Sequence, residues 1–280
     1  MKRFLLLVAV LLGSIAMSAQ QTSTNNRLFP IRTFHVGDVE FVMVSIKGGL
    51  YMMGEKPSYL DKLQAKQYSS PIPNIIHEVY LSDFCIGQTE VTQELWNAVM
   101  DHNPSPFKGD NLPVFGISWD ECKIFITKLN SLTGESFRMP TEAEWEYAAH
   151  GGELSKHYKY AGGNNLKIVA WEGGTPRPVS TKKPNELGLF DMSGNVPEWC
   201  EDTFDATFYY NGSFDPNIPH KSNPKIAEDP INNDLDDNKV VRGGGEISDV
   251  AYDFRVTSRG CCKNNNYQNR TIGFRLALSQ

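Results

Sequence analysis

The sequence has no run of basic residues and, after its first nineteen residues, no long apolar run. Its 33 acidic residues outnumber its 27 lysines and arginines, so the formal charge is -6 at pH 7. Nucleic-acid-binding proteins gather Lys and Arg at phosphate contacts, and this composition therefore argues against nucleic acid as a partner. A transmembrane helix needs about 20 consecutive apolar residues, and none is expected in the mature chain.

Cysteine is scarce and odd in number, which limits the disulfides that can form. The five are Cys85, Cys122, Cys200, Cys261 and Cys262. In an oxidising compartment one or two disulfides can form, but an odd count leaves at least one thiol over, and the connectivity cannot be deduced. The adjacent pair fits a strained vicinal disulfide, a metal or redox site, or two buried small residues, of which the last is favoured.

Residues 1–19 predict a secretory signal peptide. Lys2 and Arg3 form a charged start, residues 4–12 are apolar, and small residues follow up to Ala19, after which we expect cleavage. The apolar run is too short to span a bilayer comfortably. We therefore expect an exported protein that is periplasmic, associated with the envelope or secreted.

The rest of the chain is expected to form one domain after a polar leader. Residues 20–37 are assigned to the leader and residues 38–280 to the domain. No internal repeat or linker interrupts the order of its elements. Aromatic residues make up 11% of the chain and glycines number 23, which favours a loop-rich globule over a helical bundle.

Alternating apolar and polar residues predict several strands. Residues 39–44 are expected to pair with residues 46–53 through a turn at Gly48 and Gly49, and residues 77–84 form another strand. Toward the C-terminus, strands are predicted at three further segments: 240–244, 254–258 and 272–278. The remaining segments after residue 150 are rich in Gly, Asn and Asp and predict mostly loops.

Three helices are predicted from apolar residues at helical spacing. They cover residues 90–100, residues 119–132 and a segment that begins near residue 141. Each follows a side chain that can accept a hydrogen bond from the first turn: Thr89 or Thr92, Ser118, and Thr141. Glu144 completes a capping box, and Gly134 is placed to end the second helix.

Residues 184–202 contain a tight turn flanked by two acids. The turn is S-G-N (193–195), since Gly and Asn tolerate the left-handed backbone that a sharp reversal needs. Asp191 and Glu198 stand on either side, with free backbone carbonyls between them. Carboxylates together with carbonyl oxygens are the ligands that Ca²⁺ prefers. From the residues alone, a solvated turn flanked by two surface acids is the favoured interpretation, because six residues separate the two acids.

Six motifs, in order along residues 38–280, resemble the formylglycine-generating enzyme family, also called sulfatase-modifying factor domains. They are G-Q-T-E-V-T-Q-E-L-W (87–96), L-P-V-F-G-I-S-W-D-E-C (112–122), F-R-M-P-T-E-A-E-W-E-Y-A-A (137–149), N-E-L-G-L-F-D-M-S-G-N-V-P-E-W (185–199), V-R-G-G-G (241–245) and I-G-F-R-L-A (272–277). The resemblance implies a single compact α+β domain with much irregular structure, related to the C-type lectin fold.

The resemblance also implies a structural calcium ion at the turn. Carried over residue by residue, the ligands are the side chains of Asp191 and Glu198 and the backbone carbonyls of Gly194 and Val196. All four can supply a hard oxygen ligand. The family's second calcium site falls on residues 170–179, which lack an aspartate, so that site is not expected.

The catalytic chemistry of the family is not expected here. The family's enzymes oxidise a substrate cysteine to formylglycine with O₂ and a copper ion held by two cysteines, because thiolates suit Cu(I). At the matching positions this chain has Ser248 and Asp253, and neither supplies a soft ligand. Cys261 and Cys262 are adjacent and cannot easily reach two points that the family spaces five residues apart. Copper is therefore not expected, and the catalytic residues are unknown.

Two functions are compatible with the resemblance. The first is a non-catalytic exported module that binds a protein, peptide or glycan in the former substrate cleft, or that serves in an envelope assembly. By family position the cleft residues are Glu246, Ser248, Tyr252, Asp253 and Arg255. The alternative is an active formylglycine-generating oxidase that acts on a sulfatase cysteine by altered chemistry. Because function follows from the site and not from the fold, we favour the first.

Overall fold

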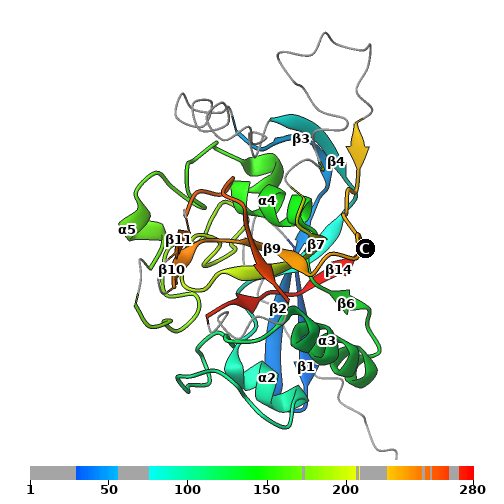
Figure 1. The fold of residues 1–280 in the computed structure, drawn as a ribbon, viewed down its shortest axis with the longest axis vertical. Coiled ribbons are helices and arrows are strands. Elements are labelled where there is room, and N and C mark those ends of the chain that lie inside the picture. The colour runs from blue at the N-terminus through cyan, green and yellow to red at the C-terminus, as the bar shows by residue number, and fades with distance from the viewer. Residues whose placement is uncertain are drawn as a thin grey trace, which may run out of the picture.

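Sheets of different sizes and a few short helices, joined by long irregular segments, make up the domain (Figure 1). The computed structural model describes residues 30–55, 76–171, 174–205, 208, 226–247, 250–252, 254–264 and 271–280. The predicted signal peptide lies outside these ranges. No helix in the described part of the chain is long and apolar enough to cross a membrane. The predicted α+β class with much irregular structure is confirmed.

The largest sheet has five strands, and every neighbouring pair in it is antiparallel. Its order is β1 (Ile31–Val36), β2 (Val39–Ile46), β5 (Phe84–Gly87), β14 (Ala277–Ser279) and β6 (Phe137–Arg138). Because side chains alternate along a strand, consecutive residues face opposite sides of this sheet. Met43 and Cys85 therefore enter one hydrophobic core, while their neighbours Val44 and Ile86 enter a second core.

Smaller sheets flank the five-stranded one. The four-stranded sheet has the order β12 (Gly260–Lys263), β9 (Asn238–Arg242), β7 (Glu198–Thr203) and β13 (Gly273–Phe274). The other two are formed by β3 (Gly49–Met53), β4 (His77–Leu81) and β8 (Ala227–Glu228), and by β10 (Gly245–Ile247) with β11 (Val250–Tyr252). Within the four-stranded sheet β7 and β13 are parallel, with Gly273 opposite Glu198. This pairing brings the C-terminal segment beside the predicted calcium turn.

The helices pack into the two cores on either side of the central sheet. α2 (Gln93–Val99) and α3 (Trp119–Thr133) fill the first core, where the Trp96 and Phe125 rings stack with centroids 5.0 Å apart. α4 (Glu142–His150) fills the second core around the buried Trp145, and Figure 1 shows it on the far side of the molecule from α2. A 3-10 turn, Gly152–Leu154, and the short α5 (Leu166–Val169) lie in the irregular part.

The predicted helix caps are confirmed. Thr92, Ser118 and Thr141 each accept a hydrogen bond from a backbone N–H in the first turn of α2, α3 and α4. In α4 the Glu144 carboxylate returns a bond to the N-cap backbone, completing the capping box. α3 ends at Gly134, whose φ of +75° is easily reached by glycine alone.

Two segments near the N-terminus differ from the prediction. Residues 31–36, expected in the leader, form β1 and pair along their length with β2. Residues 46–53 do not return along β2, because β1 and β5 already border both edges of that strand. Gly48 does not form a hairpin turn. Another backbone segment passes close to it, since a Cβ there would lie 2.1 Å from the Leu81 carbonyl oxygen. β3 pairs with β4 in a separate sheet.

Two C-terminal strands also differ. Residues 254–258 form a turn in which the Ser258 N–H donates to the Arg255 carbonyl, and Val256 is buried without strand pairing. The predicted strand at 272–278 is divided between β13 and β14, which join different sheets. Arg275 lies at the break. Its side chain is fully buried and forms an ion pair with Glu198, as a buried charge requires.

Candidate functional site

The turn between residues 191 and 198 is built from left-handed backbone conformations. Asp191, Gly194 and Asn195 have φ values of +59°, +99° and +60°. At Gly194 a Cβ would lie 2.7 Å from the Trp171 carbonyl oxygen, so only glycine fits there. Asp191 and Glu198 are both buried. The turn is therefore not the solvated loop with surface acids that the residues alone favoured.

Glu198 is held by a buried arginine and a tryptophan. Arg275 Nε lies 2.6 Å from Glu198 Oε2, and Arg275 Nη2 lies 2.6 Å from Oε1. Trp145 Nε1 donates to Oε2 at 2.7 Å. Two further guanidinium N–H groups donate to the carbonyls of Gly87 and Phe190. Both charged side chains have no solvent exposure, so this bidentate pair fixes β7, β13 and the turn in one geometry.

Two further buried acids stand near this pair and are incompletely bonded. Glu90 Oε1 accepts a hydrogen bond from Asn195 Nδ2 at 3.0 Å, whereas Glu90 Oε2 has no partner. Asp191 Oδ2 accepts from the Ser180 N–H at 2.7 Å, whereas Asp191 Oδ1 has no partner. We name Glu90, Asp191, Glu198 and Arg275 the turn cluster. A buried carboxylate oxygen without a partner is costly, and it points to a missing proton or cation.

The pKa shifts in the turn cluster also indicate that a proton or a cation is needed there. Burial and the neighbouring Asp191 and Glu198 raise the pKa of Glu90 well above its usual range. Burial and Glu198 likewise raise the pKa of Asp191. Three carboxylates against one guanidinium give a formal charge of -2 when all are ionised, which a divalent cation would neutralise.

The donor set fits calcium in part. The two carboxylate oxygens without partners are hard ligands, and the carbonyls of Gly194 and Val196 lie in the same turn. Within the described ranges no group of three or more His, Cys, Asp or Glu side chains is arranged to hold a metal ion. Any cation here would therefore depend on backbone carbonyls as well as side chains.

Glu90 and Arg275 belong to the site but were not predicted from the sequence. Glu90 lies at the start of the helix motif T-E-V-T, and Arg275 lies between two apolar residues in F-R-L. A charged residue inside an apolar run is the available signal, because a buried charge must be paired. The partner, however, could be identified only from the fold.

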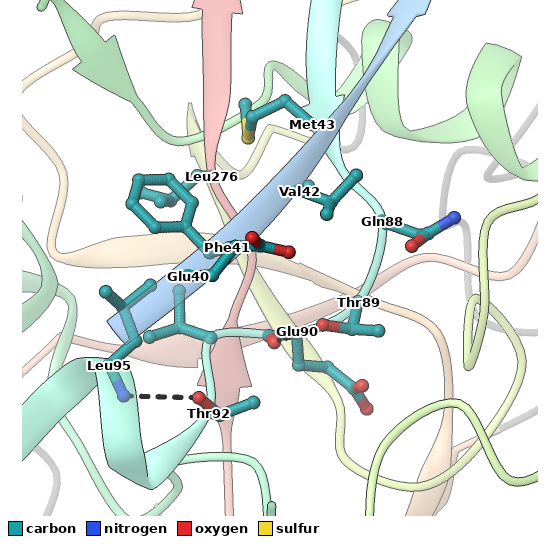
Figure 2. A pocket seen from close by; sticks show the side chains of 12 residues that line it. Glu40, Phe41, Val42, Met43, Gln88, Thr89, Glu90, Thr92, Leu95 and Leu276 are labelled. Atoms are coloured by element: carbon teal, nitrogen blue, oxygen red, sulfur yellow. Dashed lines mark hydrogen bonds between the residues drawn. The ribbon is translucent and has the colours of Figure 1, made fainter. Parts of the chain in front are cut away.

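A pocket with a volume of about 180 Å³ borders the turn cluster (Figure 2). It lies between β2, β5 and the start of α2, with Phe41, Leu95 and Leu276 on its apolar side. Glu90 lines it as well, but in Figure 2 the Glu90 carboxylate points away from Phe41 and Leu95. The predicted cleft residue Arg255 does not line this pocket.

The predicted cleft residues are only partly within the described chain. Glu246 lies on β10 and Tyr252 on β11, so the hairpin places them on adjacent strands. Ser248 and Asp253 lie outside the described residues. Arg255 forms an ion pair with Glu55.

A second buried cluster of charges lies at the start of α4. We name Glu142, Glu146, Asp202, Arg242 and Arg259 the helix cluster. Arg242 donates to Glu142 and Glu146, and Arg259 binds Glu142 with two nitrogens at 2.6 and 2.7 Å. Both oxygens of Asp202 accept backbone N–H groups, one from the first residue of α4.

The helix cluster shifts two carboxyl groups in opposite directions. Burial and the nearby Glu142 raise the pKa of Asp202 to about 7. Burial alone would raise the pKa of Glu146 too, but the Arg242 guanidinium lowers it to about 2. The Arg242 guanidinium also lies over the Trp145 ring, 5.3 Å from its centroid, so Trp145 contacts both clusters.

The cysteines are mostly structural. Cys85, Cys122 and Cys200 are buried, and no disulfide joins them to one another or to Cys261. Burial raises the pKa of the Cys122 and Cys200 thiols well above its usual range, which makes them poor nucleophiles. Cys261 is exposed and Cys262 half-buried on β12, so the interpretation of the adjacent pair as two buried residues is wrong.

Comparisons with known proteins agree on the type of domain. The family described as "Sulfatase-modifying factor enzyme 1-like domain" matches residues 40–280. The chain is 33% identical over 251 residues to chaperone protein LppX of Paenibacillus barcinonensis, covering 69% of this chain and 79% of that protein. It is 30% identical over 186 residues to the formylglycine-generating enzyme of Streptomyces coelicolor, covering 60% of this chain and 52% of that enzyme.

A solved structure supports the same assignment. Treponema denticola variable protein 1 superposes with a TM-score of 0.71 and 29% identity, covering 89% of this chain and 99% of that one. The match to the family spans most of the chain and includes the turn cluster, the helix cluster and nearly all of both cores. The chain therefore belongs to the sulfatase-modifying factor enzyme 1-like family.

Proposed function

We propose that this protein is an exported, non-catalytic member of its family that binds a protein partner. The observation that carries the proposal is the loss of the copper ligands. Ser248 and Asp253 stand where the family's enzymes have cysteines. The scaffold motifs are retained, including the Glu198–Arg275 pair. A change confined to the site favours a changed function over a degraded fold.

The relatives support a binding role. Chaperone protein LppX is matched over 79% of its length, and a chaperone works by binding another protein. The Streptomyces coelicolor enzyme is matched over 52% of its length, so its activity is a weaker guide to this chain. The signal-peptide pattern of residues 1–19 supports export.

We also propose a structural calcium ion in the turn cluster. The proposed ligands are those expected from the resemblance, Asp191, Gly194, Val196 and Glu198, together with Glu90. Glu198 would share with the ion the oxygens that already accept from Arg275 and Trp145. Glu90 is added because its Oε2 lacks a partner, as does Asp191 Oδ1. When bound, the ion would balance the excess negative charge of the buried acids and order the turn.

The proposal that the protein is non-catalytic is tested by measuring copper binding and aldehyde formation. Purified mature protein would be titrated with Cu(I) against a competing chelator and incubated with a cysteine-containing sulfatase-motif peptide. We expect neither tight copper nor aldehyde. As a matched control, the double variant S248C/D253C restores two thiols at the family positions and should gain Cu(I) affinity.

The alternative, an active oxidase, makes the opposite prediction. Stoichiometric copper with aldehyde formation in the unmodified protein would overturn the non-catalytic proposal. In that case Cys261 and Cys262 become the candidate ligands, and C261S and C262S should each abolish copper binding.

A further inference from the structure

One stretch of this acidic protein is basic. Residues 155–183 contain six lysines and arginines and one acid, a local formal charge of +5 in a chain whose total is -6. These residues are spaced along the sequence, so they form no basic run. A local excess of this size sets up a positive potential on an otherwise acidic protein.

Five of the six cations have no carboxylate partner in the described part of the chain. They are Lys159, Lys167, Arg177, Lys182 and Lys183, which we name the basic patch. Elsewhere the exposed cations are commonly paired with acids: Arg32 with Glu135, Lys47 with Glu153, and Lys128 with Asp101. The sixth cation of the stretch, Lys156, pairs with Glu186. Like charges gathered without an acidic partner among the described residues repel one another, so they are suited to an anionic partner.

The fold gathers the basic patch onto one segment around α5, at the left edge of Figure 1. Lys182 Nζ donates to the Lys167 carbonyl at 2.6 Å, and Lys183 Nζ donates to the Gly162 carbonyl at 2.9 Å. The Lys183 N–H donates to the Ile168 carbonyl. Main-chain carbonyls thus hold two of the ammonium groups without neutralising them.

Aromatic rings in this segment are covered by its cations. Lys182 Nζ lies 4.0 Å from the Trp171 ring centroid, and Arg177 Cζ lies 5.5 Å from it. Lys159 Nζ lies 4.9 Å from the Tyr160 ring centroid. Stacking on an aromatic ring orders a cation without removing its charge. It also occupies ring faces that a sugar would otherwise use.

Backbone hydrogen bonds connect the segment of the basic patch to the turn that holds the turn cluster. The Arg177 N–H donates to Asn195 Oδ1 at 2.9 Å, and the Ser180 N–H donates to Asp191 Oδ2 at 2.7 Å. Asn195 in turn donates to Glu90. The patch therefore has a rigid base, which lowers the cost of ordering its side chains on binding.

We propose that the basic patch binds an acidic polypeptide segment, an assignment that rests on the proposed protein-binding function. Charge complementarity calls for an anionic partner. Ile168, which is 53% exposed, adds an apolar contact among the lysines. Acidic side chains interspersed with apolar ones match this surface, whereas a purely polar anionic glycan would leave Ile168 uncovered.

The test measures peptide binding by fluorescence anisotropy on the full mature chain. The probe is a labelled peptide of alternating Glu and Leu, and its control has Gln in place of Glu. The variant K159Q/K167Q/K183Q should weaken binding of the acidic peptide by at least about tenfold. The matched variant R32Q/K47Q/K128Q removes the same charge from paired positions and should change affinity less than about threefold.

Three results would overturn the proposal. Equal losses in both triple variants would mean a net-charge effect without a site. A heparin oligosaccharide or single-stranded DNA of equal charge binding more tightly than the peptide would assign the patch to another class of polyanion. If the protein neither binds the peptide nor forms aldehyde, peptide binding by the basic patch is rejected and the proposed function is not. If the same preparation forms aldehyde, the proposed function is rejected.

Discussion

The turn cluster and the helix cluster bury similar charges but balance them differently. In the helix cluster, Glu142 and Glu146 have a hydrogen-bond partner on every carboxylate oxygen. In the turn cluster, Glu90 and Asp191 each leave one oxygen without a partner. In the helix cluster the atom without a hydrogen-bond partner is a donor, Arg242 Nε.

The difference lies in the number of arginines. Three acids face two guanidinium groups in the helix cluster, and three acids face one in the turn cluster. A buried cluster of charges is stable only when it is paired, so the larger excess of negative charge in the turn cluster favours a bound cation there over the helix cluster. The following predictions test this contrast, beginning with the largest effect.

Removing the only guanidinium of the turn cluster should be the most damaging change. Arg275→Met leaves Glu198 buried without its partner, and we expect the free energy of unfolding to fall by roughly 3–5 kcal/mol in urea denaturation. Arg259→Met is the control, because Arg242 still pairs with both Glu142 and Glu146 in the helix cluster. A loss as large for Arg259→Met as for Arg275→Met would mean that the two clusters are balanced alike.

Calcium should stabilise the protein through the turn cluster alone. At a concentration 100 times its Kd, we expect Ca²⁺ to raise the free energy of unfolding by about 2.7 kcal/mol. Thermal unfolding with Ca²⁺, with Mg²⁺ and with a chelator would measure the increment. Glu90→Gln should abolish it, while the control Glu40→Gln, an exposed acid beside the same pocket, should retain it. An unchanged increment in Glu90→Gln would remove Glu90 from the proposed ligands.

The helix cluster should instead respond to pH. Because the pKa of Asp202 is about 7 in the folded state and 3.8 in a model compound, the folded protein holds a proton that the unfolded chain releases between these values. This contribution to stability is present at low pH and is lost as the pH rises toward 7. From pH 5 to pH 7 we expect wild type to lose about 2 kcal/mol relative to Asp202→Asn.

Urea denaturation of both proteins at each pH isolates the contribution of Asp202 to the free energy of unfolding, since the two proteins share all other titrating groups. A free energy of unfolding of wild type that rises with pH relative to that of Asp202→Asn would contradict the sign. A difference independent of pH would mean that Asp202 is ionised throughout this range.

The smallest effect is expected at the link between the turn cluster and the basic patch. Asn195→Gly keeps the left-handed backbone but removes the bonds to Glu90 and to the Arg177 N–H. We expect a loss of about 1–2 kcal/mol in the free energy of unfolding. Acidic-peptide binding should weaken as well. Stability loss without weaker binding would separate the patch from the turn.

Local patterns predicted the helices well and the sheets poorly. The caps at Ser118 and Thr141 need only the neighbouring residues, so they could be identified from the sequence. The pairing of residues 46–53 could not, because it depends on which edges of β2 distant strands already occupy.

In the candidate site, too, the sequence identified the residues that are close together in the chain and missed those brought in by the fold. The turn with Asp191 and Glu198 follows from short-range turn chemistry and the resemblance to a known family. Glu90 and Arg275 lie far from the turn in sequence and reach it only through the fold. The basic patch was missed because its charges are spread over residues 155–183 and were hidden by the acidic total.

The two hydrogen bonds from Arg177 and Ser180 to the turn have a thermodynamic consequence. If the proposed calcium ion and the proposed acidic peptide both bind, these bonds connect their two sites. Any factor by which calcium changes the affinity for the peptide must then equal the factor by which the peptide changes the affinity for calcium.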